Sequence, residues 1–284
     1  MGQAVLLEEH LAPQLALQIG AAQLLASRQS RYQRIDVYDS PAFGRLFRLD
    51  GVLMSSEADE FYYHETLVHP ALLSQSRPQR VLVLGGGDGG SARQALKHGS
   101  VQRIDVVELD AEVVALARQY LPGVHGGAFD DPRVVLHIGD GKDFVSACRE
   151  TYELIVLDLT DPVGAAAPLY TPAFFADAAR CLSPGGCLTL HLGSPVYALQ
   201  QVVALQAALR QVFPLQRLML LPIPSYGGMW ALAVASLTTD VAGFGQDQIN
   251  QRLLDSKISD LRYYNAEIHH ALLALPGFLR RALS

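Results

Sequence analysis

The sequence has few cysteines, no run of basic residues and no cluster with metal-ligand spacing. Its three cysteines, Cys148, Cys181 and Cys187, form no C-x-x-C pair and leave one over in any pairing, so they indicate reduced thiols. The formal net charge is -6 and lysines and arginines are scattered, which disfavours a nucleic-acid partner because phosphate binding needs a basic face. No grouping of histidine, cysteine and carboxylate residues predicts a metal site.

The sequence also lacks an apolar run of the roughly 20 residues that a membrane helix needs. The stretch 11–26 is apolar, but glutamines interrupt it and no positively charged segment precedes it, so it does not resemble a secretory signal. We therefore expect a cytoplasmic protein with no membrane partner. Half of the 284 residues are apolar, which is enough to build the core of a globular enzyme-like protein.

The apolar pattern divides the chain near residue 56. Residues 1–29 mix leucine and alanine with glutamine at irregular spacing and predict an amphipathic, helix-prone lead. Between residues 32 and 54 the period changes to two, with turn residues between the apolar positions, and this pattern predicts antiparallel hairpins. We expect a small N-terminal β-hairpin domain over 1–56 and a larger domain over 57–284.

The larger domain shows a predicted helix over 57–73 and then a series of short apolar runs. These runs lie at 81–84, 104–107, 134–138 and 154–157, with a fifth at 187–191, and helical patterns separate the first three. Buried strands that alternate with helices predict an α/β fold with a parallel sheet covered on both faces. Right-handed crossovers place the carboxyl ends of the strands at one edge, where a ligand crevice is expected.

A glycine-rich loop, GGGDGG, follows the first of these strands. Gly85, Gly87 and Gly90 match the G-x-G-x-x-G spacing, which permits a tight turn and a close approach of the backbone to a nucleotide. Glu108 ends the next predicted strand, where a carboxylate can accept two hydrogen bonds from a ribose diol. Together they predict a nucleoside site; the alternative is a plain strand-helix corner with a solvated charge after it.

Asp88 lies inside the glycine loop and restricts which nucleoside fits. A carboxylate there would repel a pyrophosphate at the N-terminus of the following helix, which disfavours a NAD-dependent oxidoreductase. S-adenosyl ligands have no phosphate and carry an amine and a sulfonium, so they suit this loop better.

Further carboxylates follow the later predicted strands. Asp140 follows the third strand, and Asp158 and Asp161 follow the fourth. Asp140 alone is equally well explained as a helix cap. Together with Asp88 and Glu108, however, these residues predict an anionic crevice that holds cationic ligands.

These motifs resemble those of the polyamine aminopropyltransferase family, in particular the bacterial spermidine synthases. The resemblance extends from about Tyr32 to the C-terminus. The segments that carry it are AFGR at 42–45, LDG at 49–51, DEF at 59–61, YHE at 63–65, the GGGDGG loop, VELD at 107–110, DPR at 131–133, the stretch 158–164, PSYGG at 224–228 and LRYYN at 261–265.

The resemblance implies a fold, an assembly and an activity. The fold is α/β, a Rossmann-like, methyltransferase-type domain with a small N-terminal antiparallel β domain, assembled as a homodimer or homotetramer. The activity transfers the aminopropyl group of decarboxylated S-adenosylmethionine, a co-substrate rather than a tightly bound cofactor, to a small diamine. With putrescine as the acceptor the products are spermidine and methylthioadenosine.

The resemblance also implies roles for the matched residues. Asp158 corresponds to the proton acceptor of the family and is the implied catalytic residue. The nucleoside co-substrate would be held by Gln33, Gly85, Gly87, Asp88, Glu108, Asp140 and Gly141, with Asp88 on the aminopropyl amine. The diamine would be bound by Tyr63, His64, Asp88, Asp158, Asp161 and Tyr226.

Proton transfer from an amine with a pKa of about 10 to a carboxylate with a pKa of about 4 is unfavourable unless the protein reduces the difference between the two pKa values. We expect burial, together with the charge of Asp161, to raise the pKa of Asp158. For His64, which lies on the apolar pattern of its predicted helix, a core histidine is the alternative.

The chain departs from the family at several positions. Ala165 stands where the family often has proline, His191 where it often has glutamine, and the tryptophan and Thr-Glu pair of the family's N-terminal hairpin are missing before residue 30. These departures leave the acceptor open to cadaverine, agmatine or spermidine. An S-adenosylmethionine methyltransferase on the same fold and a catalytically silent polyamine or nucleoside sensor are further alternatives.

Overall fold

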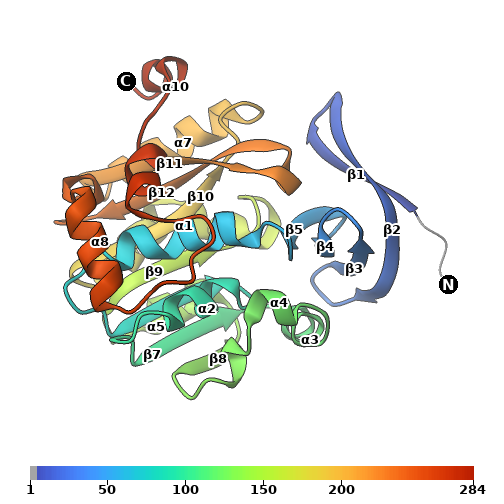
Figure 1. The fold of residues 1–284 in the computed structure, drawn as a ribbon, viewed down its shortest axis with the longest axis horizontal. Helices are drawn as coiled ribbons and strands as arrows, with labels where there is room; N and C mark the ends of the chain where they lie inside the picture. The colour runs from blue at the N-terminus through green and yellow to red at the C-terminus, as the bar shows by residue number, and fades with distance from the viewer. Residues whose placement is uncertain (1–4) are drawn as a thin grey trace.

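Two β-sheets organise the protein in the computed structural model, which describes residues 5–284 (Figure 1). The first sheet is antiparallel, with five strands in chain order. They are β1 (Val5–Ala12), β2 (Leu15–Gln29), β3 (Arg34–Ser40), β4 (Gly44–Leu49) and β5 (Val52–Ser56). The period-two pattern of the sequence is explained here, since Ile35 and Val37 of β3 and Phe47 of β4 are buried on one face.

The predicted helix-prone lead over 1–29 is wrong for the described part of that segment, because residues 5–12 and 15–29 form β1 and β2. Residues 1–4 lie outside the described residues. Leucine, alanine and glutamine favour helices by only about 0.7 kcal/mol or less per residue. That preference is overridden because β2 hydrogen-bonds to β1 along one edge and to β3 along the other.

The second sheet has seven strands in the order β11-β12-β10-β9-β6-β7-β8. Its strands are β6 (Arg80–Gly85), β7 (Arg103–Glu108), β8 (Val134–Ile138), β9 (Tyr152–Asp158), β10 (Leu182–Gly193), β11 (Leu215–Ile223) and β12 (Gly228–Ser236). The five strands from β6 to β10 are parallel, whereas β12 runs antiparallel to β10 and β11 antiparallel to β12. The four predicted strands and the fifth at 187–191 are confirmed, and so is the α/β fold class with its N-terminal antiparallel sheet.

Helices cover both faces of this sheet (Figure 1). The α-helices of residues 5–284 are α1 (Glu60–Leu72), α2 (Gly90–Leu96), α3 (Ala111–Tyr120), α4 (Pro122–His125), α5 (Gly141–Ala147), α6 (Pro172–Arg180), α7 (Leu199–Arg210), α8 (Gln246–Asp255), α9 (Ala266–Leu272) and α10 (Gly277–Ala282). Of these, α3 and α4 pack against β3 and β4 of the first sheet instead. Alternate residues of each central strand enter different cores: Leu82 and Leu84 pack with α6 and α7, and Val81 and Val83 pack with α1 and α2.

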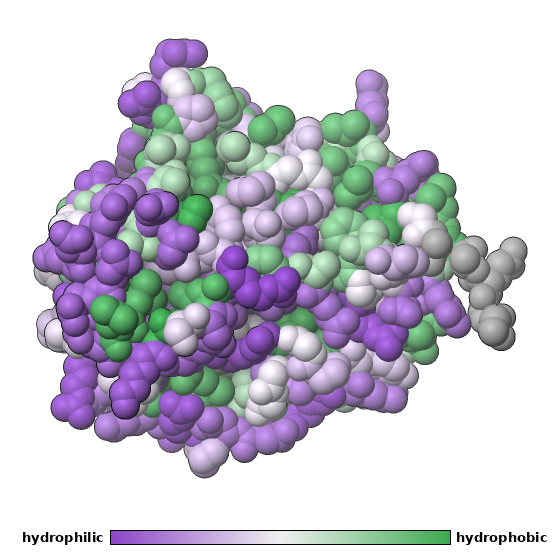
Figure 2. Space-filling model, in the orientation of Figure 1, coloured by the Kyte–Doolittle hydropathy of each residue, from purple (hydrophilic) through white to green (hydrophobic). Residues whose placement is uncertain are grey.

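The surface of the N-terminal sheet carries exposed apolar side chains. Val5 and Leu6 of β1 and Leu15 and Leu24 of β2 are each more than a third exposed. In the space-filling view, hydrophobic residues stand among hydrophilic ones over this part of the molecule (Figure 2). Across residues 5–284, the structure contains no helix with both the length and the apolar character needed to cross a membrane.

Candidate active site

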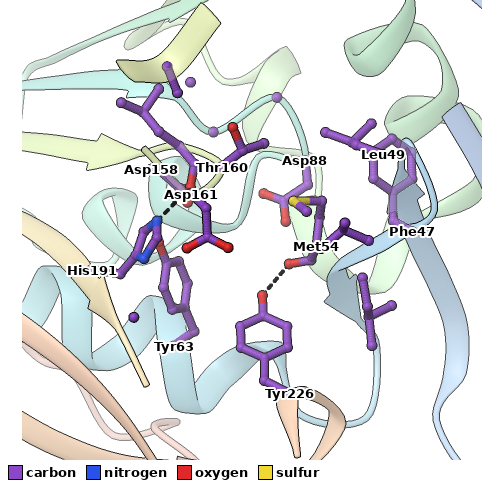
Figure 3. A pocket seen from close by; sticks show the side chains of 18 of the residues that line it. Phe47, Leu49, Met54, Tyr63, Asp88, Asp158, Thr160, Asp161, His191 and Tyr226 are labelled. Atoms are coloured by element: carbon purple, nitrogen blue, oxygen red, sulfur yellow. Dashed lines mark hydrogen bonds between the residues drawn. The ribbon is translucent and has the colours of Figure 1, made fainter. Parts of the chain in front are cut away.

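A cavity of about 300 Å³ lies between the carboxyl ends of the central parallel strands and the N-terminal sheet. Its volume is at the lower end of the range typical of small-molecule sites, about 300–1,000 Å³. The cavity brings together every site residue predicted from the sequence: Gln33, Tyr63, His64, Gly85, Gly87, Asp88, Glu108, Asp140, Gly141, Asp158, Asp161 and Tyr226. Many of these side chains point toward a common space (Figure 3).

The glycine loop brings two strand ends into close contact. Gly85 has a φ of +78°, and a Cβ there would lie 2.1 Å from the carbonyl oxygen of Asp158. A Cβ at Gly87 would lie 2.8 Å from Oε2 of Glu108. Since neither position has room for a side chain, glycine is what allows the carboxylates of Glu108 and Asp158 to lie beside this loop.

Glu108 is the last residue of β7 and is buried against the start of α3. Its Oε1 accepts a hydrogen bond from the backbone N–H of Asp110 at 2.9 Å. Burial raises the pKa of Glu108 to about 7. The negative charges of Asp110 and Asp158 also raise it, whereas the hydrogen bond from the Asp110 backbone lowers it. Gln33 reaches the same corner from the N-terminal sheet, where its Nε2 donates to Asp110 at 3.2 Å.

Asp140 serves as a helix cap and also lines the cavity. Its Oδ1 accepts a hydrogen bond from the backbone N–H of Lys142 at 2.7 Å, at the N-terminus of α5. Capping is therefore observed for this residue, and its place in the cavity lining is compatible with a role in ligand binding.

Two carboxylates of the cavity approach the same ring nitrogen of His64. Its Nε2 is 3.5 Å from Oδ2 of Asp88 and 3.8 Å from Oδ2 of Asp158, and its Nδ1 is 2.7 Å from Oε2 of Glu60. Burial opposes the charged imidazolium, but Asp88, Glu60 and Asp158 outweigh it and raise the pKa of His64 to about 10. Although His64, Asp88 and Asp158 have the spacing of metal ligands, a protonated imidazole has no lone pair to give a metal.

Asp158 ends β9 and lies beside the glycine loop. Ser91 of α2 donates its hydroxyl hydrogen to Oδ2 of Asp158 at 2.7 Å. Burial raises the pKa of Asp158 and the charge of Asp88 adds to the rise, while His64 and Ser91 lower it. The expected upward shift is thus present, but the leading repelling carboxylate is Asp88, whereas the sequence pointed to Asp161. The nearest polar partner of Asp161 is instead Gln201, whose Nε2 lies 3.4 Å from Oδ1.

Aromatic side chains form the wall opposite the glycine loop. The rings of Tyr63 and Tyr226 have centroids 6.4 Å apart, and Tyr226 donates its hydroxyl hydrogen to the Met54 carbonyl of β5 (Figure 3). Burial raises the pKa of both tyrosines, so their hydroxyls stay neutral. Such rings can pack against an aliphatic chain and attract a cation over their faces.

Several residues of the site were not identified from the sequence. Glu60 orients His64, and its place four residues earlier on the same helix could have indicated it. Ser91 and Met54 had no sequence signal, since their roles depend on how α2 and β5 pack against β9 and Tyr226. Residues 9–11 of β1 also line the cavity, so the N-terminal segment contributes directly to it.

Comparisons with known proteins show the family of this chain. Residues 60–242 match the spermine/spermidine synthase domain, and residues 5–57 match the spermidine synthase tetramerisation domain. The polyamine aminopropyltransferase of Nitrosomonas europaea is 44% identical over 276 residues, which cover 97% of this chain and 85% of that protein. Polyamine aminopropyltransferase 1 of Pseudomonas aeruginosa is 38% identical, covering 92% and 91% of the two chains.

Solved structures lead to the same family. A spermidine synthase in complex with the transition state analogue AdoDATO superposes with a TM-score of 0.92 at 33% identity, covering 98% of this chain and 94% of that one. The spermidine synthase of Thermotoga maritima superposes with a TM-score of 0.91 at 33% identity, covering 99% and 94%. The resemblance noted in the sequence is confirmed, and the chain belongs to the spermine/spermidine synthase family, whose relatives named here are polyamine aminopropyltransferases.

Proposed function

We propose that this enzyme transfers the aminopropyl group of decarboxylated S-adenosylmethionine to putrescine, giving spermidine and methylthioadenosine. The observation that carries the proposal is the convergence of Asp88 and Asp158 beside Nε2 of His64, in a cavity that Glu108 also lines. A nucleoside held through Glu108 would present its cationic tail to these two carboxylates. The solved relative in complex with AdoDATO supports the same reaction class.

Charge discriminates between the two possible donors. S-adenosylmethionine carries a carboxylate that would meet Asp88 and Asp158, and burial in a cavity strengthens such like-charge repulsion. The decarboxylated donor lacks that group and keeps the amine and the sulfonium. Asp88 would hold the amine, with its own Oδ1 fixed by the backbone N–H of Gly90 at 2.9 Å.

The reaction is a displacement at carbon. The neutral amine nitrogen of the acceptor attacks the propyl carbon bonded to sulfur, the C–S bond breaks, and its electron pair leaves with methylthioadenosine as an uncharged thioether. The attacking nitrogen becomes positively charged and loses a proton to Asp158. Because sulfonium is already a good leaving group, the protein mainly holds the reactants in line, an effect that can contribute about 7–11 kcal/mol.

The environment of Asp158 favours the proton transfer. Burial and the charge of Asp88 raise the pKa of this carboxylate toward that of the amine. Burial also lowers the pKa of a bound amine, so both shifts narrow the gap of about 6 units between the free groups. The hydrogen bond from Ser91 fixes Oδ2, which leaves Oδ1 as the oxygen that takes the proton.

The second amine of the acceptor needs a separate anionic partner. Asp161 lines the same cavity beyond Asp158 and lies near the aromatic wall formed by Tyr63 and Tyr226. In this arrangement the aliphatic chain of the diamine packs along the two rings while its distal ammonium pairs with Asp161.

The experiment that tests the proposal is the release of methylthioadenosine from the decarboxylated donor with putrescine, cadaverine, agmatine or spermidine as acceptor. Fast release with putrescine is the expected result. Release with another amine alone would keep the reaction and change the acceptor. No release with any amine, while the nucleoside still binds, would favour the silent sensor instead.

We further infer that the protein assembles as a homotetramer or homodimer through its N-terminal sheet. The match of residues 5–57 to the tetramerisation domain supports this assembly, as do the exposed Leu6, Leu15 and Leu24 on β1 and β2. Light scattering of the purified protein should give a multiple of the 30.8 kDa chain. A monomer at micromolar concentration would contradict the inference.

A further inference from the structure

Asp161 lies in segment 159–163, which connects the end of β9 with the 3₁₀ helix η2 (Gly164–Tyr170). Asp158 ends a strand that pairs with β6 and β10, but segment 159–163 belongs to no strand or helix. Asp161 is half-buried, and Val163 in the same segment is 66% exposed. The position of the Asp161 carboxylate, which the proposed function assigns to the distal ammonium, therefore depends on contacts from other parts of the chain.

Gln201 of α7 contacts this carboxylate. Its Nε2 lies 3.4 Å from Oδ1 of Asp161 and 3.1 Å from the carbonyl oxygen of Leu192 on β10. A carbonyl oxygen and an ionised carboxylate can only accept hydrogen bonds, so the side-chain amide of Gln201 donates to both. Its two hydrogens thus link Asp161 to the end of β10. The contact holds Asp161 to two elements of the larger domain, β10 and α7.

Gly193 leaves room for this amide. It has a φ of +98°, and a Cβ there would lie 2.7 Å from Nε2 of Gln201. The register between β10 and β12 also shifts between His191 and Gly193, an irregularity typical of a bulge. A side chain at position 193 would therefore displace the Gln201 amide from Asp161. Glycine at the end of β10 is what permits the contact between α7 and this carboxylate.

We propose that Gln201 is a positioning residue that fixes Asp161 at a set distance from Asp158, so that this distance selects the acceptor by the spacing of its two amines. The inference rests on the proposed function and adds to it a cause of acceptor preference. Gln201 is uncharged and lines the same cavity, so it orients Asp161 without neutralising it. A carboxylate has about four acceptor positions, and the amide uses one of them, which leaves others for the ammonium.

Replacement of Gln201 by methionine removes the donor and keeps a side chain of similar length. In Gln201→Met the Asp161 carboxylate loses its fixed orientation, so the KM for putrescine should rise about fivefold to tenfold, as expected when a hydrogen bond to a charged group is lost. The kcat should change by less than about threefold, because Asp158 and its contacts are untouched. Gln200→Met is the matched control, since Gln200 precedes Gln201 on α7, is exposed and does not line the cavity; its KM should equal that of wild type.

The ratio of kcat/KM for putrescine to kcat/KM for cadaverine measures selection by length, because cadaverine has one more methylene between its amines. Wild-type enzyme should favour putrescine by about tenfold or more, the discrimination that one methylene can give. If Asp161 is no longer fixed, it can meet an ammonium at either distance, so the ratio should fall at least about threefold in Gln201→Met. A wild-type ratio near 1, or the same ratio in Gln201→Met and wild type, would overturn the proposal.

A double-mutant cycle tests whether Gln201 acts through Asp161. Asp161→Asn removes the charge that pairs with the distal ammonium, and Gln201→Met added to it should then alter the KM for putrescine by less than about twofold. A general structural role of Gln201 would instead raise KM by the same factor in both backgrounds, and that result would refute the inference. If wild-type enzyme transfers to no amine, the proposed function itself fails; if it turns over with putrescine but Gln201→Met keeps its KM and its selectivity, only this inference fails.

Discussion

Replacement of Asp158 by asparagine changes one charge at the centre of the site and little else. Asparagine has nearly the same shape, and its amide oxygen can still accept the hydrogen bond that Ser91 donates at 2.7 Å. His64 keeps Asp88 and Glu60 as partners, which are its two strongest attractive contacts, so it stays protonated near neutral pH. The variant therefore removes the proton acceptor while it preserves the packing around it.

The size of the effect follows from the role of the carboxylate. Removal of a positioned general base typically lowers the rate by 10²–10⁴-fold, which corresponds to about 3–5.5 kcal/mol in activation free energy. We expect kcat of Asp158→Asn to fall within this range. Affinity for methylthioadenosine should change by less than about threefold, because Glu108 is untouched and even loses one repelling charge.

The assay is methylthioadenosine release at saturating donor and amine, with calorimetry for the nucleoside affinity. Asp247→Asn is a matched control, since Asp247 is an exposed acid of α8 and does not line the cavity, and its rate should equal that of wild type. A kcat for Asp158→Asn within threefold of wild type would refute the assignment of Asp158 as proton acceptor.

Three further predictions concern binding, stability and the loop. The pKa of Glu108 is about 7, and a ribose diol needs the ionised carboxylate. The affinity for methylthioadenosine, measured by calorimetry, should therefore fall up to tenfold per pH unit below pH 7. In Glu108→Gln this dependence of affinity on pH should disappear. Burial lowers the pKa of His69 to about 3, so the unfolded state binds a proton at this residue before the folded state does as pH falls below about 6.5. The free energy of unfolding measured in urea should therefore decrease toward pH 3 by up to about 1.4 kcal/mol per pH unit. The decrease should be less steep in His69→Gln. In Gly90→Ala, the new Cβ would lie 2.2 Å from Cε1 of His64 and would push this side chain out of place, so kcat should fall at least tenfold in the release assay. The total helix content by circular dichroism should stay that of wild type, and an unchanged kcat would contradict a role of His64 in the diamine site.

The parallel sheet was predictable because its signals are local. Each central strand is a short, continuous apolar run, and the residue that ends the strand is glycine or an acid: Gly85, Glu108 and Asp158. Topology rules then place these ends at one edge, which is how the sequence identified the lining of the cavity before any contact was known.

The N-terminal segment was not predictable in the same way. β2 is rich in leucine, alanine and glutamine, and its strand conformation comes from pairing with both β1 and β3. Such pairing is a tertiary effect that composition does not show. The contribution of residues 9–11 to the cavity therefore also could not be seen from the sequence.

Electrostatic detail was the other part that needed the structure. The sequence places Asp158 and Asp161 three residues apart, yet Asp88 supplies the main repulsion on Asp158 because the glycine loop folds back over β9. Likewise, the sequence shows a histidine at position 191 where the family often has glutamine. The contact of its Nε2 with the carbonyl oxygen of Leu159 is seen only in the structure.

Product mass from one pair of incubations tests the central claim most directly. The enzyme is mixed with putrescine and either decarboxylated S-adenosylmethionine or S-adenosylmethionine, and the amine products are identified by mass spectrometry. The anionic cavity predicts an aminopropylated diamine with the decarboxylated donor and no modified amine with S-adenosylmethionine. A methylated product from S-adenosylmethionine, with none from the decarboxylated donor, would contradict the account.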